Sequence, residues 1–323
     1  MRAKPASINN SVEPVGLSGR TFSVNGQNLT VPKPVPGLYI VATPIGNLGD
    51  ITLRALETLA GVDVIACEDT RITRRLTERY AIKAELKPYH EHNAATVRPK
   101  ILARLARGEA IALVSDAGTP LISDPGFKLV REVCAAGHRV IALPGPSSVL
   151  AALSVAALPT DRFFFAGFLP AKETARRARL SELCKLDATL VLFESGNRVQ
   201  DTIADLAAIM GEREAAICRE LTKMHEDITR APLAELSRRA DKLETRGEFV
   251  LVIGPPLEQA QTMTADALDD LLRISLQAAS VRDAVAHAVE ISGRPRREVY
   301  ARALELAREV SAGSDAKAAH EKT

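Results

Sequence analysis

The chain has 323 residues, which suggests two domains at about 150 residues each, and its 46% hydrophobic and 25% charged content is typical of a globular protein. Its net charge of +2 excludes binding to nucleic acid through overall charge, so any such binding must come from local basic patches. No apolar run reaches the roughly 20 residues that span a bilayer, and no apolar signal core opens the chain, so we expect a cytoplasmic protein.

The first part of the chain divides into a polar leader and a regular α/β pattern. Residues 1–36 are rich in Ser, Asn, Val and Pro, and we expect a flexible N-terminal extension there. Residues 37–157 then alternate short apolar runs with helical stretches, which favours a mostly parallel sheet covered on both faces. The predicted strands are Leu38–Ala42, Val62–Cys67, Ala110–Val114 and Arg139–Leu143, and the predicted helices are Ile51–Ala60, Thr96–Arg107, Phe127–Ala136 and Val149–Ala157.

Residues 158–256 have the pattern of a second α/β domain. Its predicted strands are Phe163–Phe168, Thr189–Phe193, Ala215–Arg219 and Glu248–Ile253, with helices near Thr174–Lys185, Val199–Met210 and Pro232–Leu243. Residues 262–312 are predicted to form a C-terminal helical appendage, and residues 313–323 a flexible tail. The three predicted helices of the appendage are Ala265–Ala279, Val281–Ile291 and Arg296–Val310.

The most informative loop follows the apolar run that ends at Val114. Residues 115–126 are dense in Asp, Gly, Thr and Pro, and a helix-like segment follows them. In α/β proteins a strand, a rigid loop and a helix in this order build ligand sites at the carboxyl ends of strands. Asp116 could accept hydrogen bonds from a ligand, and Gly118 would let a ligand approach the backbone. From spacing alone, a ligand loop and a plain connection remain equally open.

Charged clusters follow three other predicted strands, at residues 68–71, 194–198 and 219–226. Together with the Gly/Pro loops at residues 43–49 and 144–148 they favour a cleft for a polar substrate over helix caps and surface ion pairs. Neither a Gly-x-Gly-x-x-Gly fingerprint nor a P-loop is present, which weakens NAD-type and nucleoside-triphosphate interpretations. Gly-x-Ser-x-Gly and His-Glu-x-x-His are also absent, which weakens hydrolase and zincin interpretations.

Metal and disulfide chemistry find little support in the sequence. His90 and His92 could coordinate a metal, but a hydrogen-bonded surface pair is favoured because no third ligand is apparent. The four cysteines form no Cys-x-x-Cys pair and lie in apolar runs, so we expect buried thiols. They are Cys67, Cys134, Cys184 and Cys218.

Arginine and lysine residues gather in three places that could bind phosphates, although solvated helix faces are the ordinary explanation for any one of them. The groups are Arg71/Arg74/Arg75/Arg79, Lys172/Arg176/Arg177/Arg179 and Arg294/Arg296/Arg297.

Seven segments together resemble the RsmI family. They are Thr-Pro-Ile-Gly-Asn-Leu-Gly-Asp-Ile-Thr-x-Arg-Ala-Leu (43–56), Glu-Asp-Thr-Arg (68–71), Ser-Asp-Ala-Gly-Thr-Pro-Leu-Ile-Ser-Asp-Pro-Gly (115–126), Leu-Pro-Gly-Pro (143–146), Gly-Phe-Leu-Pro-Ala-Lys (167–172), Arg-Glu-Leu-Thr-Lys (219–223) and Gly-Glu-Phe-Val-Leu (247–251). The resemblance implies two α/β domains of the tetrapyrrole-methylase (class III methyltransferase) type, with a cofactor cleft between them and a helical appendage. It also implies 2′-O-methylation, with S-adenosylmethionine, of a cytidine (cytidine 1402) of 16S rRNA in the small ribosomal subunit, by a homodimer.

The resemblance also assigns cofactor-binding positions. The loop at residues 116–119 would meet the methionine part of S-adenosylmethionine, and two other loops and the second domain would supply further contacts. These expected residues are Ile45, Asp116, Ala117, Gly118, Thr119, Ser147, Ser148 and Phe193.

The chemistry itself requires few protein groups. The cofactor supplies the electrophilic methyl group, so the protein must align a ribose hydroxyl and help remove its proton, through a carboxylate, a desolvated lysine or a cation that stabilises the alkoxide. The candidates, unranked, are Glu68, Asp69, Arg71, Glu220, Lys223 and Glu226. No metal is expected. Two alternatives remain open: a methylase of a small tetrapyrrole-like metabolite, and a non-catalytic RNA-binding assembly factor.

Overall fold

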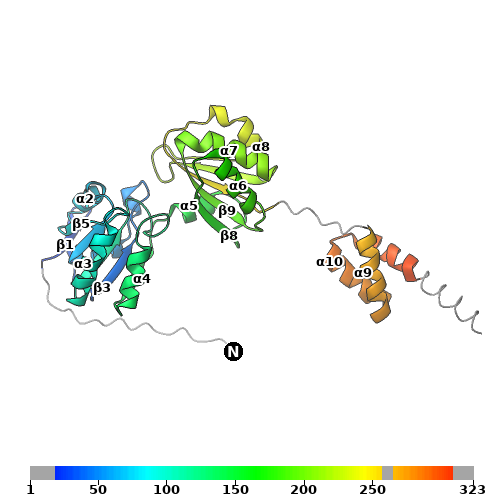
Figure 1. Ribbon diagram of the computed structural model, residues 1–323, viewed down its shortest axis with the longest axis horizontal. Coiled ribbons are helices and arrows are strands. Elements are labelled where there is room, and N and C mark those ends of the chain that lie inside the picture. The colour runs from blue at the N-terminus through cyan, green and yellow to red at the C-terminus, as the bar shows by residue number, and fades with distance from the viewer. Residues whose placement is uncertain (1–18, 257–264, 308–323) are drawn as a thin grey trace, which may run out of the picture. The chain divides into compact units, whose positions relative to one another are not determined.

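The computed structural model describes residues 19–256 and 265–307 of the chain. These residues fall into two compact units that divide between Pro255 and Pro256 (Figure 1). The first unit contains a β-hairpin and two five-stranded sheets, and the second contains only helices. The two units are described separately below.

The first sheet is entirely parallel, in agreement with the mostly parallel sheet that the sequence pattern predicts. Its strand order is β5-β4-β6-β3-β7. Its central strands are continuous apolar runs because helices cover both faces of a parallel sheet. One face packs against α1 and α2, and the other against α3 and α4. The strands are β3 (Gly37–Val41), β4 (Val64–Cys67), β5 (Glu85–Pro88), β6 (Ala110–Val114) and β7 (Val140–Leu143), and the helices are α1 (Leu53–Gly61), α2 (Thr70–Arg79), α3 (Ala94–Ala106) and α4 (Phe127–Ala135), with the 3₁₀ turn η1 (Leu48–Asp50).

The N-terminal hairpin corrects the expectation of a flexible extension over residues 1–36. Strands β1 (Thr21–Val24) and β2 (Gln27–Thr30) pair antiparallel around Asn25 and Gly26, whose φ values of 51° and 78° suit a tight hairpin turn. Phe22 is only 1% exposed and packs into the core under α1. Residues 19–36 are therefore part of the folded unit, and residues 1–18 lie outside the described residues.

The second sheet is mixed, in the order β11-β10-β12-β9-β8, and only β8 and β9 run parallel. Helices α6, α7 and α8 pack on one face of it (Figure 1), and α5 packs on the other. The strands are β8 (Phe163–Phe168), β9 (Thr189–Ser195), β10 (Glu214–Arg219), β11 (Asp227–Pro232) and β12 (Glu248–Ile253), and the helices are α5 (Ser148–Val155), α6 (Glu173–Leu183), α7 (Gly196–Met210) and α8 (Leu233–Arg238), with the 3₁₀ turn η2 (Ala240–Lys242).

Two edge strands and one helix differ from the sequence-based expectation. Strands β5 and β11 were not predicted, because each lies at a sheet edge and lacks a continuous apolar run. The single helix expected over Pro232–Leu243 is instead the short α8 followed by η2, with Arg239 as the C-cap of α8 at φ −105° and ψ 0°.

The second unit has its own small apolar core, built from α9 (Ala265–Ala278), α10 (Val281–Ser292) and helical residues 296–307. Ser280 caps α10 through its hydroxyl, and Gly293 ends it in the left-handed conformation. Residues 308–310 of the third predicted helix and the tail at 313–323 lie outside the described residues. None of the described helices is long and apolar enough to cross a membrane.

The cysteines only partly follow the expectation of buried thiols. Cys67 and Cys218 are buried, but Cys184 is half-buried and Cys134 is exposed on α4. Cys134 points away from the sheet because its neighbour Val133 occupies the buried face of the same amphipathic helix. All four are free thiols.

Candidate functional site

Three loops at the carboxyl edge of the first sheet are hydrogen-bonded to one another. Thr43, after β3, and Gly118, after β6, exchange two backbone hydrogen bonds of 2.9 Å. The Thr43 hydroxyl also donates to the Ser115 carbonyl at 3.1 Å, and the Thr119 hydroxyl donates to the Pro146 carbonyl, after β7, at 3.1 Å. These bonds connect the three loops into one rigid rim.

Gly118 has a φ of +76°, which an L side chain rarely adopts. A Cβ atom at this position would come within 3.4 Å of the Ile45 side chain. This distance is an ordinary van der Waals contact, so the backbone conformation, not the available space, is what requires glycine here.

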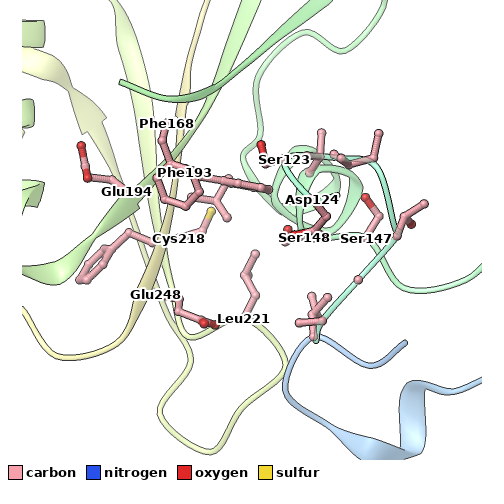
Figure 2. Close-up of a pocket in the computed structure, with 18 of the residues that line it drawn as sticks. Ser123, Asp124, Ser147, Ser148, Phe168, Phe193, Glu194, Cys218, Leu221 and Glu248 are labelled. Atoms are coloured by element: carbon pink, nitrogen blue, oxygen red, sulfur yellow. The ribbon is translucent and has the colours of Figure 1, made fainter. Parts of the chain in front are cut away.

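A first cavity of about 320 Å³ opens beside this rim, which is in the range of ~300–1,000 Å³ typical of small-molecule sites. Both sheets contribute to its wall, and Figure 2 shows the labelled side chains of the second sheet facing those of the first. From the first half come Ile45, Ala117, Gly118, Thr119, Ile122, Ser123, Asp124, Ser147, Ser148 and Val149, and from the second come Phe168, Phe193, Glu194, Ser195, Cys218, Leu221, Gly247, Glu248, Phe249 and Val250.

The second-sheet wall of the first cavity is largely apolar. The rings of Phe168 and Phe193 lie 5.6 Å apart in an edge-to-face arrangement, and the ring of Phe165 lies 4.9 Å from that of Phe193. Burial raises the pKa of the Cys218 thiol to about 11, so this wall carries a neutral thiol at pH 7. Phe168 is 58% exposed, so its ring is available to a flat apolar group in the cavity.

A buried carboxylate supports the same wall from behind. The Glu194 side chain is 0% exposed, although it follows the apolar run of β9. Its two oxygens accept hydrogen bonds of 2.8 Å from the Ser195 amide and from the Thr202 hydroxyl, and Arg198 lies 3.5 Å away. These partners satisfy the buried carboxyl group and fix the end of β9 against α7.

Carboxylates gather on the first-sheet side of the site. Burial raises the pKa values of Glu68, Asp116 and Asp124, and for Glu68 the nearby carboxylates of the other two raise it further. Asp69 behaves in the opposite way, since its hydrogen bonds with Arg71 lower its pKa to about 2. One oxygen of Asp116 accepts the Asp69 amide at 2.9 Å, which joins the ends of β4 and β6.

A second cavity of about 440 Å³ adjoins the first, and the two share Ile45, Ala117 and Glu248 as lining residues. Its other lining residues come from the rim, from α2 and from the loop after β10. They are Thr43, Pro44, Gly46, Leu48, Ile72, Thr73, Arg75, Leu76, Ser115, Asp116 and Lys223.

Lys223 extends from the loop after β10 across the first-sheet loop. Its Nζ donates to Glu220 at 2.8 Å and to Glu248 at 2.7 Å. A Cβ atom on Gly46 would lie 2.3 Å from the Lys223 Cγ, so the lysine stem occupies the space that the glycine leaves. Burial alone would lower the pKa of Lys223, but the two carboxylates raise it above its ordinary value. Lys223 is therefore a fixed cation at neutral pH, suited to stabilise negative charge and not to act as a base.

The sequence-predicted cofactor residues come together in the structure. Seven of them line the first cavity, and Asp116 lies in the wall of the second. The seven are Ile45, Ala117, Gly118, Thr119, Ser147, Ser148 and Phe193.

The predicted catalytic residues are more dispersed. Lys223 lines the second cavity, whereas Glu220 lines a separate cavity of about 400 Å³ with Arg219, His225 and Arg246. The other four line none of these three cavities in the described part of the chain: Glu68, Asp69, Arg71 and Glu226. Glu226 instead accepts the Thr222 amide at 2.7 Å, and Arg71 is held by Asp69 at 2.6 Å.

Several lining residues were not singled out from the sequence. Ser123 and Asp124 lie within the motif at residues 115–126, so the motif itself was the available signal. Phe168 and Glu248 also lie in quoted motifs, but only the packing of the two sheets brings them to a cavity. Among the described residues no group of three His, Cys, Asp or Glu could hold a metal ion, and the rings of His90 and His92 simply lie 6.0 Å apart.

Comparison with known proteins gives two family matches and close relatives. A family described as tetrapyrrole (corrin/porphyrin) methylases matches residues 37–237, and one described as the RsmI C-terminal HTH domain matches residues 262–307. The ribosomal RNA small subunit methyltransferase I of Mesorhizobium japonicum is 47% identical over 285 residues, covering 87% of this chain and 96% of the relative. The protein of the same name from Escherichia coli O157:H7 is 46% identical over 271 residues, covering 83% and 94%.

Solved structures support the fold alone. A cobalt precorrin-4 methyltransferase of cobalamin biosynthesis superimposes with a TM-score of 0.52 at 19% identity, covering 67% of this chain and 94% of the neighbour. A diphthine synthase gives a TM-score of 0.54 at 15% identity, covering 67% and 89%.

Proposed function

The chain belongs to the tetrapyrrole methylase family and, within it, to the ribosomal RNA small subunit methyltransferase I (RsmI) family, and from this premise we propose that it 2′-O-methylates a cytidine of 16S rRNA. Its cofactor is S-adenosylmethionine. We further propose that the substrate is the RNA within the small ribosomal subunit and that the enzyme acts as a homodimer.

The first cavity is the proposed cofactor site, and its composition carries the proposal. S-adenosylmethionine combines a flat purine, a ribose and a charged amino-acid end. The cavity offers an apolar aromatic wall at Phe168 and Phe193 and a polar wall at Ser147, Ser148 and Asp124. The backbone of Gly118 also lines this cavity. One cavity thus contains a surface suited to each part of the molecule.

The protein's own contribution to the reaction is orientation and charge. When bound, the cofactor supplies an electrophilic methyl group, and the acceptor hydroxyl must approach it in line. Glu248 lines both cavities, so it lies at the junction through which an acceptor would reach the first one. The fixed ammonium of Lys223, 2.7 Å from Glu248, is placed to stabilise negative charge on the acceptor oxygen. The group that removes the proton stays a prediction, and the candidate carboxylates are Glu68, Asp69, Glu220 and Glu226.

The test is ribose-methylation mapping of small-subunit RNA with and without the gene, followed by reconstitution. Purified protein and S-adenosylmethionine should restore one 2′-O-methyl group on a cytidine when added to small subunits from the deletion strain. A Phe193→Ala variant should bind the cofactor more weakly in calorimetry and should restore less of the methylation. Persistent methylation in the deletion strain, or transfer to a porphyrinoid with none to RNA, would contradict the proposal.

A further inference from the structure

The second cavity contains a cation that the described structure leaves without a partner. Arg75 lies on the exposed face of α2 and lines this cavity together with Ile72, Thr73 and Leu76. No hydrogen bond or ion pair joins its guanidinium to any other described residue. A cation that lines a cavity and has no carboxylate is available for an anionic ligand.

The neighbouring cations differ from Arg75 in this respect. Arg71, one turn earlier on α2, binds Asp69 at 2.6 Å, and Lys223 across the cavity is held by two carboxylates. Arg176, from another basic group of the sequence, is buried and binds Asp205 at 2.7 Å. Arg71 and Arg176 are each paired with a carboxylate, so the basic groups of the sequence overstate the charge that is free for a ligand.

We propose that the second cavity receives the acceptor nucleotide and that Arg75 binds a backbone phosphate next to the ribose to be methylated. This inference rests on the proposed function. The shared wall at Ile45, Ala117 and Glu248 connects the cavity directly with the cofactor site. In RNA a phosphate is bonded to the 3′ carbon's oxygen, adjacent to the 2′-hydroxyl, so a contact to it restricts where that hydroxyl can lie. A guanidinium can bind it through two parallel hydrogen bonds.

Arg75 is thus a positioning residue for RNA and has no direct part in cofactor binding. Removing its side chain should weaken the binding of the RNA substrate and leave the affinity for S-adenosylmethionine unchanged. Arg79 provides a matched control, because it is an exposed arginine on the same helix that lines none of the three cavities and has no hydrogen bond or ion pair among the described residues.

The experiment measures methyl transfer from labelled S-adenosylmethionine to small subunits isolated from a deletion strain. Arg75→Ala should raise KM for the subunit about tenfold or more, the loss expected for one charged hydrogen-bonded contact. The dependence of log affinity on log salt should become shallower by about 0.7, the value for one phosphate contact on single-stranded RNA. Arg75→Lys should retain the salt dependence, and Arg79→Ala should match wild type in both quantities.

Cofactor calorimetry on each variant reports folding independently of RNA. Equal behaviour of Arg75→Ala and Arg79→Ala, or a lower kcat with unchanged KM and salt dependence, would overturn the inference while the methyltransferase function stands. If wild-type protein transfers no methyl group to small-subunit RNA, the proposed function fails and this inference falls with it.

Discussion

The attachment of the N-terminal hairpin depends on one carboxylate, Asp63, and we predict that Asp63→Asn destabilises the first unit. Its oxygens accept hydrogen bonds of 2.8 Å from Arg20 before β1, from Lys33 after β2 and from the Ala110 amide of β6. Burial alone would raise the pKa of Asp63, but these partners outweigh it and lower the pKa from 3.8 to about 2. The change tests whether the hairpin is an integral part of the fold.

The magnitude follows from linkage between pKa and stability. At about 1.36 kcal/mol per pKa unit, the lowered pKa means that Asp63 contributes at most about 2.4 kcal/mol to the free energy of unfolding. Lys33 is 43% exposed and Arg20 27%, so solvent screening reduces this, and we expect a loss of about 1–2 kcal/mol at pH 7. A lowered carboxyl pKa stabilises the fold above pH 3.8, and the contribution disappears as the pH falls through about 2. The difference between wild type and variant should therefore shrink below pH 4.

The assay is urea unfolding of both proteins between pH 7 and pH 3. The matched control is Asp161→Asn, because Asp161 is 75% exposed and lies 3.7 Å from Arg162, so its removal should change stability by less than about 0.5 kcal/mol. A loss at pH 7 no larger than that of the control, or a loss that does not change with pH, would refute the reasoning.

Three further predictions concern the site. Burial raises the pKa of Asp116, and a raised carboxyl pKa opposes folding above pH 3.8, so Asp116→Asn should be at least as stable as wild type at pH 7 and lose any advantage near pH 3. Asp116 lines the second cavity, but the resemblance assigns it to the cofactor, so calorimetry on this variant should show S-adenosylmethionine binding at least tenfold weaker; unchanged binding would contradict that assignment and leave Asp116 to the second cavity. Gly46→Ala should displace Lys223 and reduce kcat about tenfold or more with little change in Tm, whereas an unchanged kcat would exclude a role for that lysine. Thr202→Val should cost about 1.5–3 kcal/mol in urea unfolding, because it removes a hydrogen bond to the buried Glu194; a smaller loss would mean that water or Glu194 itself rearranges.

The sequence predicted four of the five strands of the first sheet, because those four parallel strands are continuous apolar runs. The hairpin was missed because all four residues of β2 are exposed and three of them are polar, although Asn25-Gly26 was a usable turn signal. The edge strands β5 and β11 were missed because edge strands need no apolar face.

At the site, the local sequence pattern predicted where the loops lie, whereas long-range packing determines which side chains contact one another. Gly118 and its neighbours could be found because glycine-rich turns at strand ends are visible in sequence. The approach of Lys223 to Gly46 joins positions 177 residues apart, and the ion pair with Glu248 depends on how the loop after β10 folds back beside β12. Among the described residues, Arg176 is paired with a carboxylate and Arg75 is not, and this difference depends on tertiary neighbours. A run of arginines in the sequence does not reveal it.

Helix α5 limits how this protein can be divided. Its first residue, Ser148, lines the first cavity beside the rim of the first sheet, whereas Val149, Ala152 and Leu153 pack against Val191 and other residues of the second. A cut after residue 157, where the sequence changes pattern, would leave this apolar face in water and uncover the sheet that it protects. The two halves therefore cannot be exchanged as independent modules among related enzymes. A functional chimera would have to take α5 and the second sheet, which α5 covers, from the same parent enzyme.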